Sequence, residues 1–211
     1  MRLPSLLPFL ALVVACGDDG GTPMDADAAV RLDVMESRPG CTPMAPATEC
    51  VVTTWSEPAG ARDHRDPCSE ITYPSTPPAS GPHFGVWADF LVYDDEVPWG
   101  FLVHSLEHGA IVLGYDCPDG CPDVLEAFAT VVESHGSDPL CDGHPSADAR
   151  FIVTPMSGLE APVIALAWEH AYTATGVDES SLAEFVELHY GMAPEDLCVP
   201  GRAQLDGEWC P

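Results

Sequence analysis

The stretch that decides the fold covers residues 110–136, which read AIVLGYDCPDGCPDVLEAFATVVESHG. Residues 110–115 form a continuous apolar run, which is typical of a buried strand. The Pro-Asp-Gly core between Cys117 and Cys121 predicts a turn. From Pro122 to His135 apolar residues recur at helical spacing, and Gly136 ends the pattern, so this segment is predicted to be an amphipathic helix.

Further strands and a second helix are predicted on both sides of this stretch. Residues 51–55, 151–154 and 163–168 are rich in β-branched and apolar residues, which favours strands. Asp178 precedes an amphipathic helix over 179–190 as a capping residue. The core order β-α-β-β-α predicts a single α+β domain. We expect a mixed or antiparallel sheet with helices on one face, held together by disulfides.

The first sixteen residues have the features of a secretory signal. Arg2 precedes an apolar run that is too short to cross a bilayer as a helix, since spanning takes about 20 residues. The sequence VVAC at residues 13–16 resembles the bacterial lipobox, in which the cysteine is lipidated. An unmodified cysteine at the end of a signal peptide is the alternative. Gly17 after Cys16 predicts an exported lipoprotein, on the outer membrane or in the periplasm if the host is Gram-negative.

The next residues are predicted to be a flexible tether over 17–45, followed by one globular domain over 46–211. The start of the tether consists largely of Gly, Asp, Ala and Pro, with few large apolar residues. Such a segment cannot bury enough apolar surface to offset the entropy lost on ordering. The remaining length is typical of one domain.

Cysteine usage predicts a disulfide framework. The chain has nine cysteines, and setting aside Cys16 leaves eight, an even number in an exported chain. We therefore expect four disulfides, with local pairing of Cys41 with Cys50 and of Cys198 with Cys210. A zinc-thiolate site at Cys117 and Cys121 is the weaker alternative, because structural zinc sites need a second pair of ligands.

The charge balance argues against nucleic acid as a partner. Asp and Glu number 34 against 7 basic residues, for a net charge of −27, and every basic residue is an arginine. Polyphosphate and anionic lipid surfaces would repel such a chain. A solvated acidic surface is the simplest interpretation, and only a specific cluster would indicate a metal site.

The most informative motif is HSLEHG at residues 104–109, with His104 and His108 four residues apart. In a strand the two imidazoles would be about 13 Å apart, too far to share an ion. On one helical turn they are neighbours, which suits two ligands of one metal. Gly109 would end this turn and lead into the following strand. The alternative is a pair of histidines that are hydrogen-bonded to neighbouring backbone.

A third imidazole, His83, follows Gly81 and Pro82, which fix the local backbone. We therefore predict a metal site formed by His83, His104 and His108, with copper or zinc as the ion. Met156 would favour copper, and it and His170 are candidates for a fourth or outer ligand. The remaining histidines are interpreted as surface residues: His64, His135, His144 and His189.

Four sequence blocks together resemble the bacterial family of domain of unknown function 3105. They are YPSTPPASGPHF at residues 73–84, LVHSLEHG at 102–109, ALAW at 165–168 and APE at 193–195. The resemblance spans roughly residues 51–195. It implies an exported or membrane-linked protein without assigning a reaction. It also implies that His83, His104, Glu107 and His108 belong to motif blocks. The large number of cysteines departs from the family's sequence pattern, but it does not affect the interpretation of this site.

These features lead to three hypotheses on function. The first is a lipid-anchored, metal-binding protein of the cell envelope, for metal handling or metal-dependent redox chemistry. The second is a zinc hydrolase, because HxxEH over residues 104–108 matches a reversed zincin motif in which Glu107 is the general base. The third is an interaction module that binds no metal. The sequence leaves the protein partner, and whether any reaction is catalysed, open.

Overall fold

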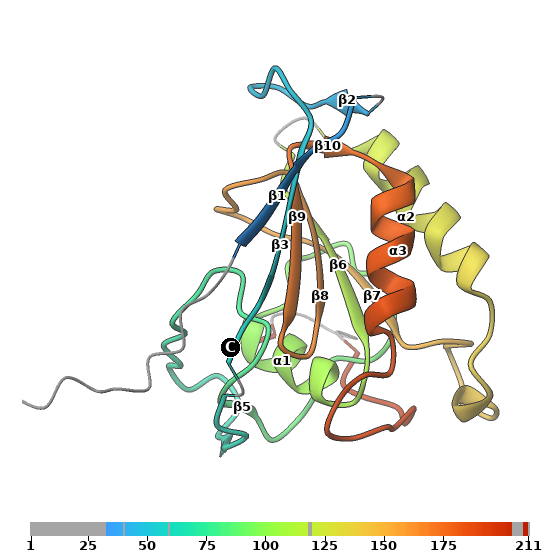
Figure 1. The fold of residues 1–211 in the computed structure, drawn as a ribbon. Helices are drawn as coiled ribbons and strands as arrows, with labels where there is room; N and C mark the ends of the chain where they lie inside the picture. Colours follow the sequence, from blue (N-terminus) through green and yellow to red (C-terminus); the bar gives the residue numbers. More distant parts are fainter. Residues whose placement is uncertain (1–32, 40, 59, 118–119, 204–208, 211) are drawn as a thin grey trace, which may run out of the picture. The chain divides into compact units, whose positions relative to one another are not determined.

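The structure is a computed structural model that describes residues 33–39, 41–58, 60–117, 120–203 and 209–210. Within these residues, a six-stranded sheet forms the centre of the fold (Figure 1). Its strands, in order across the sheet, are β1 (Asp33–Ser37), β3 (Val51–Ser56), β9 (His170–Ala174), β8 (Val163–Ala167), β6 (Ile111–Tyr115) and β7 (Phe151–Pro155). The sheet is mixed, because β6 and β7 pair in parallel and the other neighbours are antiparallel.

The two predicted helices are present as α2 (Pro122–His135) and α3 (Glu179–His189). In chain order β6, α2, β7, β8 and α3 follow the predicted β-α-β-β-α core, but two unpredicted strands, β9 and β10 (Gly176–Val177), lie between β8 and α3. Parallel neighbours need a crossover connection, and α2 lies in the one between β6 and β7. The described residues form one compact unit, so the prediction of a single α+β domain is confirmed.

Both faces of the sheet are covered, by different elements. On β6, Ile111 and Leu113 pack in one cluster with α2 and α3, whereas Val112 packs in a second cluster with α1 (Trp99–Glu107). Neighbouring side chains of a strand point to opposite faces, so α1 lies across the sheet from α2 and α3, and the prediction of helices on one face is wrong for α1. Burial on both faces explains why the sequence of this strand is apolar without alternation.

Helix α1 carries the motif that the sequence placed at a helix-to-strand junction. It begins after Pro98 and its last residue is Glu107, with His108 as the capping residue. Gly109 has φ of +87°, which turns the chain toward β6. A Cβ atom at this position would also lie 2.6 Å from a guanidinium nitrogen of Arg150. The predicted junction is therefore confirmed.

The start of the described chain corrects the predicted extent of the tether over 17–45. Strand β1 pairs with β3, and β2 (Thr42–Pro43) pairs with β10 (Gly176–Val177). All five side chains of β1 are exposed, so backbone pairing holds the strand and its composition gave no signal of order. The rest of the predicted tether and the predicted signal, residues 1–32, lie outside the described residues.

Four disulfides are present, as predicted, but only one of the two proposed local pairs is correct. Cys41 bonds to Cys50 as expected. The proposed pairing of Cys198 with Cys210 is wrong. Their partners are distant in sequence and are brought close by the fold: the pairs are Cys141–Cys198 and Cys68–Cys210. The fourth disulfide joins Cys117 to Cys121, which excludes the alternative of a zinc-thiolate site in this state.

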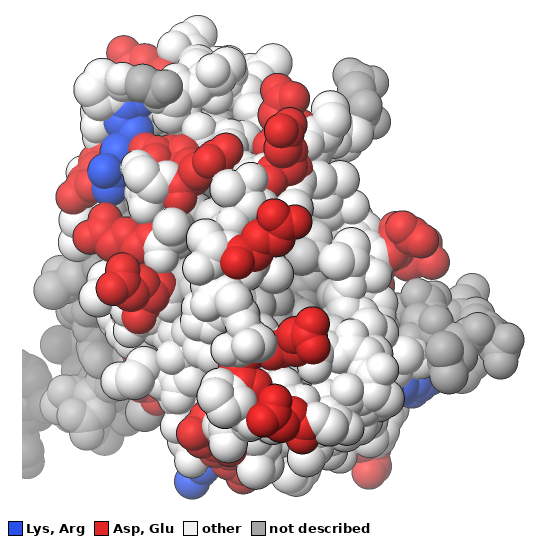
Figure 2. Space-filling view, turned by 90° about the vertical axis from the view of Figure 1, so that its right-hand side faces the viewer, with Lys and Arg blue, Asp and Glu red and all other residues white. Residues whose placement is uncertain are grey.

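Acidic residues are dispersed over the face of the molecule that Figure 2 shows. In Figure 2, Asp and Glu side chains are scattered across the visible face instead of forming one patch. This distribution fits a solvated acidic surface. In the part of the chain that the structure describes, no helix has the length and apolar character needed to cross a membrane.

Candidate metal centre

Helix α1 contributes His104 and Glu107 to the candidate site. Residues three apart on a helix lie on the same face, so the two side chains are neighbours. Both are almost fully buried, at 3% and 2% exposed. Burial of two polar side chains side by side in a protein core requires partners for their polar atoms.

Two short parallel strands bring two further histidines together. β4 (His64–Arg65) pairs with β5 (His83–Phe84), and the register places His64 opposite His83. β5 packs against α1, which carries His104. His83 is completely buried, whereas His64 is exposed.

His64, His83, His104 and Glu107 form a compact cluster. One potential ligand atom from each lies within 4.8 Å of those of the other three. The ring centroids of His83 and His104 are 4.7 Å apart, and that of His64 lies 4.9 Å from His104 and 5.1 Å from His83. The site is built from three separate segments around one point and opens to solvent on the side of His64.

Backbone carbonyls fix the protonation pattern of the two buried imidazoles. Nδ1 of His83 lies 2.9 Å from the carbonyl oxygen of Gly81, and Nδ1 of His104 lies 2.6 Å from that of Phe84. A carbonyl oxygen only accepts, so Nδ1 donates in both cases. In a neutral imidazole the Nε2 atom then has no hydrogen, and it is free to bind a metal ion.

Burial keeps these imidazoles neutral at neutral pH. It lowers the pKa of His104 to about 4, although the hydrogen bond to Phe84 acts in the opposite direction. Burial also lowers the pKa of His83, although the Gly81 carbonyl and Glu107 raise it. Neutral imidazoles are the form that binds metal ions, so the burial prepares both side chains as ligands.

One short contact in the cluster joins His83 to Glu107. Nε2 of His83 lies 3.0 Å from Oε2 of Glu107, yet Nε2 has no hydrogen-bond partner. When His83 is neutral and its Nδ1 donates to Gly81, its Nε2 has no hydrogen and presents a lone pair to the Glu107 carboxylate. A cation between them would remove the repulsion. Two ligands of a tetrahedral ion with bonds near 2.0–2.1 Å are about 3.3 Å apart, close to the observed distance.

His108, the third predicted ligand, lies beside the cluster and outside the group of four. Its ring packs 4.7 Å from that of His104, but its Nε2 lies 3.3 Å from Oε2 of Glu195. Its Nδ1 is buried without a hydrogen-bond partner among the described residues. Burial lowers the pKa of His108 to about 4. The structure thus brings together two of the three predicted ligands, His83 and His104, and places Glu107 beside them.

The cluster member that sequence reasoning missed is His64, which was interpreted as a surface residue. It is indeed exposed, but the β4–β5 pairing places it over the buried histidines. Its neighbours in the sequence form no recognisable ligand pattern, so no local signal marks it. His144, also interpreted as a surface residue, has a fully buried side chain 3.1 Å from Asp89. That interpretation is wrong for His144.

The two proposed outer ligands lie elsewhere. Met156 is buried in the core and packs against Gly114 of β6. His170 lies on β9, where its Nδ1 is 3.0 Å from the hydroxyl of Ser56 and its ring stacks on that of His189. Among the described histidines, His170 is not part of the group of potential metal ligands.

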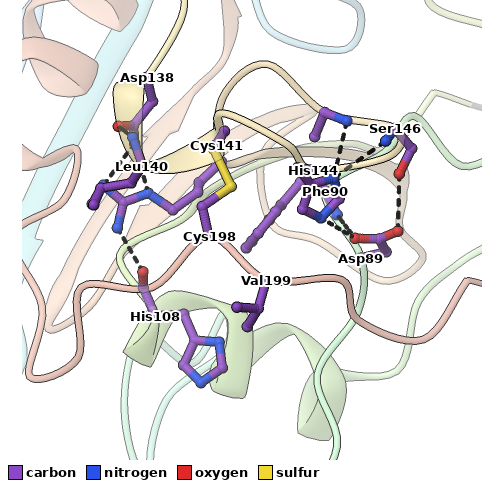
Figure 3. Close-up of a disulfide and its surroundings, with 12 residues drawn as sticks. Asp89, Phe90, His108, Asp138, Leu140, Cys141, His144, Ser146, Cys198 and Val199 are labelled. Carbon is purple, nitrogen blue, oxygen red and sulfur yellow. Dashed lines mark hydrogen bonds and ion pairs between the residues drawn. A yellow bond between two sulfur atoms is a disulfide. The ribbon is translucent and has the colours of Figure 1, made fainter.

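The segment over residues 195–198, which follows α3, forms hydrogen bonds with the end of α1. The backbone N–H of Glu195 donates to the carbonyl of Glu107, and that of Leu197 donates to the carbonyl of His108. Arg150 also donates to the His108 carbonyl, at 2.8 Å. The Cys141–Cys198 disulfide holds this segment close to His108 (Figure 3). These contacts satisfy carbonyls that a helix end leaves without partners, and they fix the position of Glu107.

A family model for proteins of unknown function, DUF3105, matches residues 64–200. The chain belongs to the DUF3105 family. The match confirms the resemblance seen in the sequence, and it begins at His64, so all four cluster residues lie within the DUF3105 region. The family description assigns no function. Comparisons with curated proteins and with solved structures give no match.

Proposed function

We propose that this DUF3105 protein binds one divalent transition-metal ion through His64, His83, His104 and Glu107. The observation that carries the proposal is the 3.0 Å contact between Nε2 of His83 and Oε2 of Glu107 in a buried site, where both atoms are acceptors when His83 is neutral. Buried polar atoms normally have a partner, and a cation supplies one for both atoms at once. The bare Nε2 of His104 and the nearby His64 ring complete four ligands.

Zinc or copper(II) is the ion that this set of ligands suits best. Imidazole nitrogens and a carboxylate oxygen are ligands for both metals. The group contains no cysteine, and Met156 packs in the core, so soft sulfur ligands that would favour copper(I) are not part of it. The site would serve metal binding and handling, or metal-dependent redox chemistry at its open side.

A metal-content measurement on the purified chain tests the proposal. After stripping with a chelator and reloading with zinc or copper(II), the chain should retain about one equivalent of metal through gel filtration. His64→Ala and His104→Ala should each abolish stoichiometric binding. His170→Ala removes a partly buried histidine outside the cluster and should leave binding intact. Sub-stoichiometric metal in the unsubstituted chain would favour the interaction module instead.

The zinc hydrolase receives less support from the contacts. In that mechanism His104 and His108 both bind zinc, and Glu107 stays free as a base. Here Oε2 of Glu107 lies 3.0 Å from Nε2 of His83, a separation that suits two ligands of one ion. The Nε2 atom of His108 is directed to Glu195 instead. A Glu107→Gln variant that keeps its zinc but loses a hydrolytic activity would establish the hydrolase and overturn the four-ligand proposal.

The cellular setting that we propose is the cell envelope, with a lipid on Cys16 as the anchor. The support comes from the sequence of residues 1–16, which lie outside the described residues. Cys16→Ser should move the protein from the membrane fraction to the soluble exported fraction. Unchanged membrane partition would contradict the anchor.

A further inference from the structure

One arginine stands at the open side of the cluster. Arg62 has its side chain 53% exposed, and one guanidinium nitrogen lies 3.6 Å from Oε1 of Glu107, whose side chain is only 3% exposed. The other carboxylate oxygen of Glu107 faces His83. Arg62 thus reaches from solvent to the edge of the buried site, two residues before the exposed ligand His64.

The metal-loaded site would carry uncompensated positive charge. Histidine ligands are neutral when they bind a metal, so a divalent ion and the Glu107 carboxylate leave one positive charge. Arg62 adds a second positive charge, and the carboxylate of Glu195, 3.3 Å from Nε2 of His108 beside the cluster, offsets one of the two. Arg65, on the same strand as His64, lies 3.6 Å from Asp63, and these two charges offset each other. Around this site the local balance is opposite to the chain's net charge of −27.

The geometry also leaves room for an external ligand. The three buried ligands approach from α1 and β5, and His64 comes from the exposed strand β4, so the ion would face solvent beside His64. Copper(II) favours tetragonal coordination by nitrogen and oxygen atoms, and it can take a ligand from solvent in addition to four protein ligands. A guanidinium presents a planar fork of donors that matches the oxygens of carboxylates and phosphates.

We propose that the metal-loaded site binds a small oxyanion, a carboxylate or a phosphate, with one oxygen on the ion and another on Arg62. This inference rests on the proposed metal site. It assigns Arg62 as the residue that selects an anionic ligand, and it distinguishes Arg62 from Arg65, which is equally exposed at 52% but paired with Asp63.

Anion titration of the copper(II)-loaded full chain tests the inference. Acetate and inorganic phosphate are the two probes, and the visible d–d absorption and electron paramagnetic resonance spectrum of the copper are the readouts. We expect a saturable spectral shift with at least one probe, and the tighter one identifies the class of anion. Arg62→Ala should weaken that affinity by about tenfold or more, as expected for loss of a charge-assisted hydrogen bond.

Two variants serve as matched controls. Arg65→Ala removes an arginine of equal exposure next to His64 and should change anion affinity by less than about twofold, because its charge is already offset. Arg62→Lys keeps the positive charge but lacks the planar set of guanidinium donors, so it should give an intermediate anion affinity. Copper affinity, measured separately by calorimetry, should not fall in Arg62→Ala.

The outcomes separate the two proposals. If copper does not bind at all, the metal site and the anion site both fail. If copper binds but neither anion changes its spectrum, only the anion site is overturned. The same holds if the Arg62→Ala and Arg65→Ala variants lose anion affinity equally, since bulk positive charge would then explain the effect.

Discussion

The Nε2 atom of His83 lies 3.0 Å from Oε2 of Glu107, and in a neutral His83 ring, whose Nδ1 donates to Gly81, both of these facing atoms are acceptors. In the metal-free protein this contact is unfavourable, because two lone pairs face each other in a buried site. A cation turns it into two ligand bonds. Metal binding and folding stability are therefore coupled through this pair.

The first prediction follows from this coupling. An ion that binds only the folded chain stabilises it by about 2.7 kcal/mol when present at 100 times its dissociation constant. For a chain of this size the midpoint of thermal unfolding should rise by about 5–10 °C. Differential scanning calorimetry with zinc, before and after a chelator, measures the shift. An unchanged midpoint at saturating zinc would contradict the site.

Glu107→Gln should move metal affinity and metal-free stability in opposite directions. The amide is a poor ligand, so the dissociation constant should rise by about 100-fold or more. The same amide can donate a hydrogen to Nε2 of His83, which should stabilise the metal-free chain by about 1 kcal/mol. Calorimetric titration and chemical unfolding test the two parts. A metal-free variant less stable than the unsubstituted protein would argue against two facing acceptors.

A comparison of His64→Ala with His108→Ala separates the ligand set seen in the structure from the one expected from sequence. His64→Ala should abolish stoichiometric zinc binding, because it removes one of four ligands. His108→Ala should change affinity by less than about tenfold, since this histidine contacts Glu195 beside the cluster. Equilibrium dialysis measures both. The reverse order of effects would restore the expected set of His83, His104 and His108.

Local sequence patterns predicted the elements around β6 and α2 well. The helix over Pro122–His135 has the predicted bounds, because its apolar spacing and the glycine after it act within a few residues. Strand β9 was missed. Residues 163–168 were interpreted as one strand without a return, whereas the chain reverses at Glu169, with φ of 65°, and pairs back as a hairpin.

The ligand set of the candidate site depends on contacts that local sequence patterns do not encode. The expectation for His104 and His108 assumed that both lie on one helix, but α1 ends at Glu107 and His108 is its capping residue. Glu107, three residues after His104, therefore takes the place next to that imidazole. His64 reaches the cluster by pairing with His83 nineteen positions away in the sequence, and such long-range pairing leaves no periodic signal in either segment.

The disulfide between Cys68 and Cys210 is predicted to position His64. Cys68 lies close after β4 and ties this exposed two-residue strand to the C-terminal segment. Replacing both cysteines with serine should cost about 2–5 kcal/mol in the free energy of unfolding. It should also weaken zinc affinity by about tenfold, measured where the variant is fully folded.

A second double variant controls for the general loss of a disulfide. Cys41 and Cys50 connect the strands near the start of the domain, and neither has a partner in the cluster. Their replacement with serine should lower stability without changing zinc affinity. Equal losses of zinc affinity in both double variants would show that the Cys68–Cys210 disulfide has no specific role in positioning His64.

Stability at acid pH should depend on the stacked rings of His170 and His189, whose centroids are 4.0 Å apart. Burial, and then the nearby His170, lower the pKa of His189 from 6.5 to about 4. Burial lowers that of His170 as well, although Glu169 raises it. Between pH 6.5 and 4 the unfolded chain therefore binds a proton at position 189 that the folded chain does not. The stability present above pH 6.5 is lost as the pH falls through this window.

His189→Gln should remove this part of the pH dependence. Chemical unfolding of the metal-free chain and of the variant at several pH values between 7 and 4 gives the two slopes, and their difference isolates position 189 from the other buried histidines. We expect a shallower loss of stability in the variant, and a change in the same direction for His170→Gln, because burial also lowers the pKa of His170. If His189→Gln loses stability as steeply as the unsubstituted chain, the stacked pair plays no part in acid sensitivity.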